Sequence, residues 1–199
     1  MSSVRSHKIL VIGPSWVGDM IMAQSLFKVL FQQHENAEIT VMAPPFTQPL
    51  LARMPEVNES LTLDLAHGEL NLKKRRRMGK ELISRRFDHA YVLPNSFKSA
   101  LIPFHAGITQ RTGWSGELRW PLLTDTRQLD KCKYPLMVQR FVALAYPPDA
   151  APPIDCPKPR LTVETMQQTE TLRAFGLKNG SRVIGICPGA EFGPAKQWP

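Results

Sequence analysis

The apolar run Ile9–Ile12 ends directly at a glycine, and this junction constrains the fold more than any other feature of the chain. A short β-branched run bounded by glycine and proline is typical of a central strand in a parallel sheet, here Lys8–Gly13. After the turn, apolar side chains recur every three or four residues, which predicts an amphipathic helix from about Gly18 to Gln33. A strand, a tight turn and a helix in this order are the repeating unit of parallel α/β folds.

The same alternation continues along the chain. Further strands are expected at Ala37–Ala43, Ser60–Leu65, Asp88–Pro94 and Thr109–Trp114. Helices are expected near Thr47–Arg53, over the basic segment after the third strand, and at Ser96–His105 and Tyr134–Tyr146. This pattern predicts an α/β fold with an open parallel sheet, helices on both faces, and ligands at the carboxyl ends of the strands.

A cluster of prolines marks a boundary. Six prolines lie between positions 147 and 159, a density that continues neither a helix nor a central strand. We therefore expect one α/β domain over residues 1–150, a linker over 151–162 and the beginning of a second α/β domain over 163–199. The second part is expected to hold a helix at Val163–Phe175 and a buried strand at Arg182–Cys187.

The first glycine turn, Gly13–Asp19, has the glycine spacing of a phosphate-binding loop but places Asp19 and Met20 where such a loop needs lysine and serine or threonine. A carboxylate there argues against a nucleotide phosphate. Two interpretations remain: Asp19 complements the helix dipole and bonds free N–H groups, or it is a general base at a strand end that Gly18 leaves open.

Polar residues gather after two further strands. Asn95, Ser96 and Lys98 follow one strand at a helix start, where Lys98 could hold a phosphate or carboxylate or could simply be solvated. In the next strand, Arg111 suits a carboxylate, and Trp114 could stack on a sugar or be a half-buried aromatic.

The net charge of +8 comes almost entirely from one segment. Between Asn71 and Arg86, eight basic residues face one acid, a local net charge of +7. The run Lys73–Arg77 is interpreted as a solvated helix face or as a patch for anionic lipid headgroups. Nucleic-acid binding is disfavoured because no aromatic residue or known binding motif accompanies the patch.

A second glycine turn, from Gly189 to Gly193, follows the expected strand Arg182–Cys187, and Lys196 lies three residues further on. Such a turn could offer backbone N–H groups to a diphosphate. The three cysteines lack paired spacing, and no metal-ligand cluster is evident, so neither a disulfide framework nor a metal site is expected.

Four segments in this order closely resemble the ADP-heptose:lipopolysaccharide heptosyltransferases, glycosyltransferase family nine: Ile12–Met20, Leu93–Leu101, Arg111–Trp114 and Cys187–Pro199. The resemblance covers the chain after Ser6 and is strongest to members that add the second heptose of the inner core. It implies two Rossmann-like domains in the GT-B arrangement, the first binding the acceptor and the second ADP-heptose. Family members are longer, so this chain alone is expected to lack most of the donor domain and to be inactive.

The resemblance also implies site roles in an inverting transfer that needs no metal and no cofactor beyond ADP-heptose as donor substrate. Asp19 would be the general base. The residues implied to bind the anionic, lipid-linked core oligosaccharide are Gly18, Asn95, Ser96, Lys98, Arg111 and Trp114. Those implied to bind the donor are Gly189, Ala190, Glu191, Phe192 and Lys196.

Three alternatives stay open: transfer of the first heptose, transfer of another sugar within the family, or a non-enzymatic α/β module that binds a nucleotide or nucleic acid. A sugar-nucleotide epimerase is disfavoured because no tyrosine has a lysine four residues later. No signal peptide and no apolar run near the roughly 18 residues of a membrane span is evident. The protein is therefore expected in the cytoplasm of a Gram-negative bacterium, peripheral to the inner membrane.

Overall fold

The computed structural model describes residues 6–66, 68–151, 155–178, 180 and 182–189. The chain divides into two compact units, Met1–Thr162 and Val163–Pro199. The boundary between them lies just after the proline cluster.

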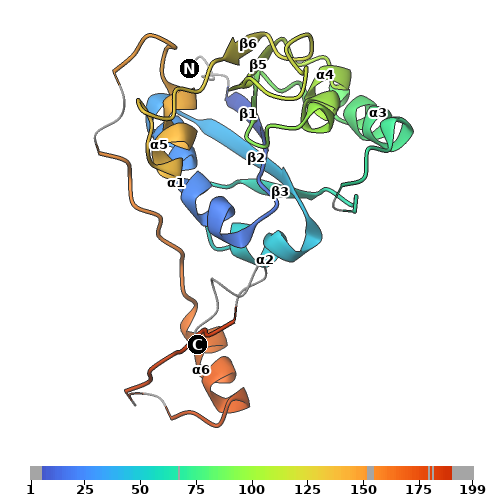
Figure 1. The fold of residues 1–199 in the computed structure, drawn as a ribbon. Coiled ribbons are helices and arrows are strands. Elements are labelled where there is room, and N and C mark those ends of the chain that lie inside the picture. The colour runs from blue at the N-terminus through green and yellow to red at the C-terminus, as the bar shows by residue number, and fades with distance from the viewer. Residues whose placement is uncertain (1–5, 67, 152–154, 179, 181, 190–199) are drawn as a thin grey trace, which may run out of the picture. The chain divides into compact units, whose positions relative to one another are not determined.

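The first unit is built on a six-stranded parallel sheet with the order β3-β2-β1-β4-β5-β6 (Figure 1). The strands are β1 His7–Ile12, β2 Ala37–Ala43, β3 Glu59–Thr62, β4 His89–Val92, β5 Gln110–Trp114 and β6 Asp125–Arg127. From β1 the chain first builds the sheet in one direction and then, from β4, in the other. This reversal places a crevice between β1 and β4 at their carboxyl ends, where α/β sheets bind ligands.

The helices largely follow the expected positions. They are α1 Val17–Gln33, α2 Gln48–Leu51, α3 Leu72–Glu81, α4 Leu101–His105, α5 Met137–Val142 and α6 Thr165–Ala174. Short 3-10 turns precede or extend four of the expected segments, at Pro45–Thr47 (η1), Ile83–Arg85 (η2), Phe97–Ala100 (η3) and Ala143–Ala145 (η4). The α/β fold and the parallel sheet are therefore confirmed.

Both faces of the sheet are buried, as the apolar run in β1 predicts. Ile9 and Val11 belong to a cluster with residues of α1, α2 and α5, whereas Leu10 and Ile12 belong to a second cluster with residues of α4. Figure 1 shows α1 and α5 on one side of the sheet and α3 and α4 on the other. Successive side chains of β1 point to opposite faces of the sheet and therefore belong to the two clusters alternately.

The last residues of the first unit are tied to it by buried polar groups. Gln24 of α1, which is fully buried, donates to the Arg160 carbonyl at 2.8 Å and accepts from the Arg160 amide at 2.9 Å. Ser25 donates to the Pro157 carbonyl at 2.6 Å, and the Thr162 amide donates to the Arg53 carbonyl at 2.8 Å. These hydrogen bonds hold residues 157–162, the end of the expected linker, against α1 and Arg53.

The structure has one strand that was not expected and does not form one that was. β6 consists of three polar residues without an apolar run, so no sequence pattern indicates it. In the second unit, residues 182–189 have no regular secondary structure, although Arg182–Cys187 was expected to be a strand. A strand needs a hydrogen-bonded neighbour, and none of the described residues pairs with this segment. No helix in the described ranges is long and apolar enough to cross a membrane.

Candidate active site

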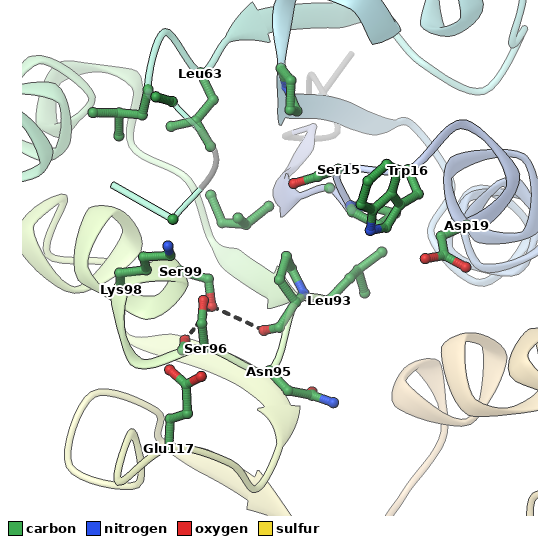
Figure 2. Close-up of a pocket in the computed structure, with 18 of the residues that line it drawn as sticks. Ser15, Trp16, Asp19, Leu63, Leu93, Asn95, Ser96, Lys98, Ser99 and Glu117 are labelled. Atoms are coloured by element: carbon green, nitrogen blue, oxygen red, sulfur yellow. Dashed lines mark hydrogen bonds between the residues drawn. The ribbon is translucent and has the colours of Figure 1, made fainter. Parts of the chain in front are cut away.

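A cavity of about 590 Å³ opens at the carboxyl ends of β1, β2, β3 and β4. Its walls come from the segments that follow these strands, together with Arg75 of α3, Glu117 after β5, and Met137 and Phe141 of α5. Figure 2 shows Asp19 at one end of this cavity and Lys98 at the other, with Ser15 and Trp16 between them. The cavity therefore lies at the crevice that the sheet topology predicts.

The turn after β1 carries Asp19 into this cavity. A Cβ on Gly13 would lie 2.7 Å from Met20 Cε and 3.2 Å from Val41 Cγ1, so a larger residue here would have to displace side chains of α1 and β2. Trp16 is the N-cap of α1, and its carbonyl accepts from the Met20 amide at 2.9 Å. This bond places Asp19 in the first turn of α1, beside the positive end of the helix dipole.

The Asp19 carboxylate is half-buried, and among the described residues it has neither a hydrogen-bond donor nor an ion-pair partner. The interpretation that Asp19 bonds free N–H groups of its helix therefore finds no contact to support it. A carboxylate that lines a cavity with its oxygens unoccupied is suited to accept a proton from a bound hydroxyl.

The turn after β4 is held by a serine. The Ser99 hydroxyl bonds the Pro94 carbonyl at 2.9 Å and the Ser96 carbonyl at 2.6 Å (Figure 2). The Phe97 amide donates to Glu117 at 2.9 Å, which ties this turn to the loop after β5. Asn95, Ser96 and Lys98 line the cavity as expected, and within the described chain no acid pairs with the Lys98 ammonium.

Two buried arginines support this turn, and sequence reasoning missed both. Arg119 is fully buried and donates to the carbonyls of Pro94 and Trp114, to Ser99 and to Asn95. Its burial lowers the pKa of the guanidinium from 12.5 to about 10. The position after Glu117-Leu118 offers no sequence signal that would distinguish Arg119 from a solvated arginine.

Arg75 is the second buried arginine, at 4% exposed. It donates to the carbonyls of Glu69 at 2.8 Å, Leu70 at 2.6 Å and Lys98 at 3.2 Å. Its burial likewise lowers the pKa of the guanidinium. The centre of the basic run is thus part of the cavity wall rather than of a solvated face.

Arg111 and Trp114, both expected at the acceptor site, are not among the residues that line the cavity. Arg111 is the second residue of β5, at the strand end opposite the cavity, and donates to the Leu122 carbonyl at 2.6 Å and to the Ile108 carbonyl. Trp114 is 5% exposed, packs on Tyr134 with ring centroids 5.6 Å apart, and donates to the Arg140 carbonyl at 3.0 Å. Both side chains therefore make their hydrogen bonds and ring contacts within the first unit.

The remaining expected site residues are placed as follows. Gly18 is exposed on α1 outside the cavity lining, and a Cβ there would meet no atom within 4 Å. Gly189 is exposed in the second unit, whereas Ala190, Glu191, Phe192 and Lys196 lie outside the described residues. Over the described ranges, no group of three histidine, cysteine or acidic residues could hold a metal ion.

The outer face of α3 is basic and exposed. Lys73, Arg76, Arg77 and Lys80 surround a shallow depression on this helix together with Glu81. Lys74 instead pairs with Asp64 at 2.8 Å. The exposed basic face of α3 therefore consists of four residues, with the adjoining side chains of Leu70 and Leu72 about half exposed.

Comparison with known proteins gives consistent similarities. The model of glycosyltransferase family 9 (heptosyltransferase) matches residues 75–199. Lipopolysaccharide heptosyltransferase 2 of Escherichia coli is 54% identical over 197 residues, and lipooligosaccharide heptosyltransferase 2 of Haemophilus influenzae is 54% identical over 198. Each alignment covers 96% of this chain and 57% of the relative, so the chain spans little more than half the length of these relatives.

A solved structure gives the same picture. The structure of the E. coli ADP-heptose lipopolysaccharide heptosyltransferase II superimposes with a TM-score of 0.87 at 51% identity. The superposition covers 96% of this chain and 57% of that chain.

Proposed function

Since the chain belongs to glycosyltransferase family 9, the heptosyltransferases, we propose that its full-length protein transfers heptose from ADP-heptose to the heptose of a lipopolysaccharide inner core. The observation that carries the proposal is Asp19, a carboxylate without a partner among the described residues that lines a cavity at the carboxyl ends of the strands. This arrangement suits a base that acts on a bound acceptor.

In the proposed reaction, Asp19 takes the proton of an acceptor hydroxyl as that oxygen attacks the anomeric carbon of ADP-heptose. A new carbon–oxygen bond forms, the bond to the diphosphate breaks, and ADP leaves with the electron pair, so that the anomeric configuration inverts. No metal ion takes part in this proposal.

The acceptor is proposed to bind in the cavity of the first unit. Lys98 would face an anionic group of the acceptor, a carboxylate or phosphate, while Asn95 and Ser96 bond its hydroxyl groups. Arg75 and Arg119 would keep the turn that carries these residues in place. The donor diphosphate is assigned to the second glycine turn, from Gly189 to Phe192, with Lys196.

The outer face of α3 is proposed to contact anionic headgroups at the cytoplasmic face of the inner membrane. Each of its four cations near such a surface contributes on the order of 1 kcal/mol. Reversing Lys73, Arg76 and Arg77 to Glu should abolish sedimentation of the full-length protein with anionic vesicles. Reversing the exposed Lys131 and Lys158 should leave it unchanged, and equal effects would contradict the assignment.

The test of function is heptose transfer by the full-length protein, followed as ADP release and as mass gain of a core acceptor that bears one heptose. Asp19→Asn should lower kcat by about 10²- to 10⁴-fold, because it removes the base and keeps the shape of the side chain. Glu35→Gln, an exposed acid beyond the other end of α1, is the matched control and should leave kcat unchanged. Near-normal transfer by Asp19→Asn would exclude its role as the base.

The same assay distinguishes the alternatives. Transfer only to a core that lacks heptose would indicate addition of the first heptose, and transfer only from another sugar nucleotide would indicate a different donor. Tight ADP or RNA binding without any transfer would favour a non-enzymatic module.

A further inference from the structure

Two large aromatic side chains lie at the cavity and remain exposed to solvent. Trp16 is 44% exposed and Phe46, in η1 after β2, is 60% exposed. Phe31, Phe104 and Trp120 of the same unit are also exposed, but none of them lines the cavity. Trp16 and Phe46 are therefore the exposed aromatic residues that the fold places at the cavity.

The two aromatic residues come from neighbouring strand ends. β1 and β2 are paired along their length, and the pairing continues into the turn, where the Gly13 amide donates to the Met42 carbonyl at 2.9 Å. Trp16 and Phe46 thus follow adjacent strands and line one cavity. A single exposed aromatic residue is ordinary, whereas two beside a carboxylate and a set of polar groups form the lining of a ligand site.

Trp16 is also linked in position to Asp19. It is the N-cap of α1, and Asp19 lies three residues later, a spacing that puts both side chains on one side of the first helical turn. Figure 2 shows Trp16 between Ser15 and Asp19, on the side of the cavity away from Lys98. A group that packs against the Trp16 indole is therefore close to the Asp19 carboxylate.

The chemistry of the lining matches a sugar ring. A pyranose has C–H faces that are apolar and an edge of hydroxyl groups, and aromatic rings with polar atoms around them match both parts. The indole of Trp114, which the sequence suggested for this purpose, is buried against Tyr134 and cannot do so. Trp16 instead lines the cavity and is 44% exposed.

We propose that Trp16 and Phe46 are the ring-binding walls of the acceptor site, which pack on the C–H face of a sugar and hold its reactive hydroxyl at Asp19. The proposal rests on the proposed function, since it gives Asp19 the role of base. It assigns to these two residues a part in recognising the acceptor and no part in binding ADP-heptose.

The test uses the full-length protein and two measurements, steady-state transfer and calorimetric binding of a delipidated inner-core saccharide that bears one heptose. Trp16→Leu and Phe46→Leu should each raise the acceptor KM and the saccharide Kd by about tenfold. Trp16→Phe, which keeps an aromatic ring, should recover most of this loss. The KM for ADP-heptose should not change in any of the three variants.

Trp120→Leu is the control, because Trp120 is 66% exposed and lies outside the cavity lining. It should leave every constant unchanged. An unchanged acceptor KM and saccharide Kd in Trp16→Leu would overturn the proposal while transfer by the parent protein upholds the proposed function. A rise confined to the KM for ADP-heptose would also overturn it. If the parent protein transfers no heptose, the proposed function fails, and the saccharide Kd still decides the role of the two rings.

Discussion

Arg119 provides a test of how the candidate site is supported. Its guanidinium is fully buried and donates to the carbonyls of Trp114 and Pro94, to the Ser99 hydroxyl at 3.2 Å and to the Asn95 side chain at 3.2 Å. Among the described residues no carboxylate bonds it directly. Arg119 thus joins the ends of β4 and β5 through neutral acceptors, and Glu117 acts on its charge without a direct bond.

The pKa shift and the hydrogen bonds of Arg119 set how much its replacement should change the free energy of unfolding. The fall in pKa from 12.5 to about 10 means that burial disfavours the charged form by about 3 kcal/mol, at about 1.4 kcal/mol per pKa unit. Arg119→Met removes this cost but takes the guanidinium donors from the Trp114 carbonyl, at about 1–3 kcal/mol for a buried acceptor left without a donor. The Pro94 carbonyl keeps the Ser99 hydroxyl as its donor. Arg119→Lys keeps a buried charge, and an ammonium cannot reach as many acceptors as the planar guanidinium.

We therefore expect the gain and the loss in Arg119→Met to offset to within about 2 kcal/mol of the free energy of unfolding, and Arg119→Lys to be no more stable than Arg119→Met. The assay is urea unfolding of the 199-residue chain, followed by circular dichroism, with Arg173→Lys in α6 as control because that residue is exposed in the second unit. If Arg119→Lys is more stable than Arg119→Met by well over 1 kcal/mol, the buried charge stabilises the fold and the reasoning is refuted.

Two further predictions concern the packing of the first unit. Burial, reinforced by the nearby His7, lowers the pKa of His89 in β4 from 6.5 to about 4, so between these values the unfolded chain binds a proton that the folded chain does not. Stability should therefore fall by up to about 3 kcal/mol as pH drops from about 6.5 to 4, and urea unfolding of His89→Gln across this range should show a shallower fall. Gly79→Ala should destabilise by about 1–3 kcal/mol in the same assay, because the new Cβ would lie 2.6 Å from His105 Cβ and 2.7 Å from the Ile102 carbonyl where α3 meets α4. Gly18→Ala on α1 is its control, since a Cβ there meets nothing within 4 Å, and equal losses in the two variants would contradict the packing argument.

The centre of the sheet is predictable from the sequence because its strands are buried on both faces. β1 contains the apolar run Ile9–Ile12 and β2 is mostly apolar, and the structure ends each within a residue of the expected position. β6 is a three-residue edge strand, Asp125–Arg127, that is only half-buried, so no periodicity reveals it. Segment Arg182–Cys187 has the composition of a strand but no pairing partner among the described residues, and composition alone does not form a strand.

The position of the candidate site is predictable for a related reason, whereas the direction of its side chains is not. Parallel strands bring their carboxyl ends to one edge, so the segments of Asp19 and Lys98 had to approach each other. Arg111 and Trp114 belong to the same strand, yet one lies at its far end and the other points into the core. Arginine and tryptophan combine an apolar body with a polar tip, so their identity does not say whether the tip meets a ligand or a backbone carbonyl.

The basic run Lys73–Arg77 indicates by its length that one of its cations faces the protein, although its net charge alone suggests only a solvated face. An α-helix turns once every 3.6 residues, so five consecutive side chains point around its whole circumference and cannot all face solvent. At least one of these cations had to turn toward the protein, and a guanidinium can satisfy its donors with carbonyls. Arg75 does this with Glu69, Leu70 and Lys98, and thereby ties α3 to the turn after β4. The helix proposed to contact the membrane is in this way attached to the turn proposed to bind the acceptor, because one of its own cations faces inward.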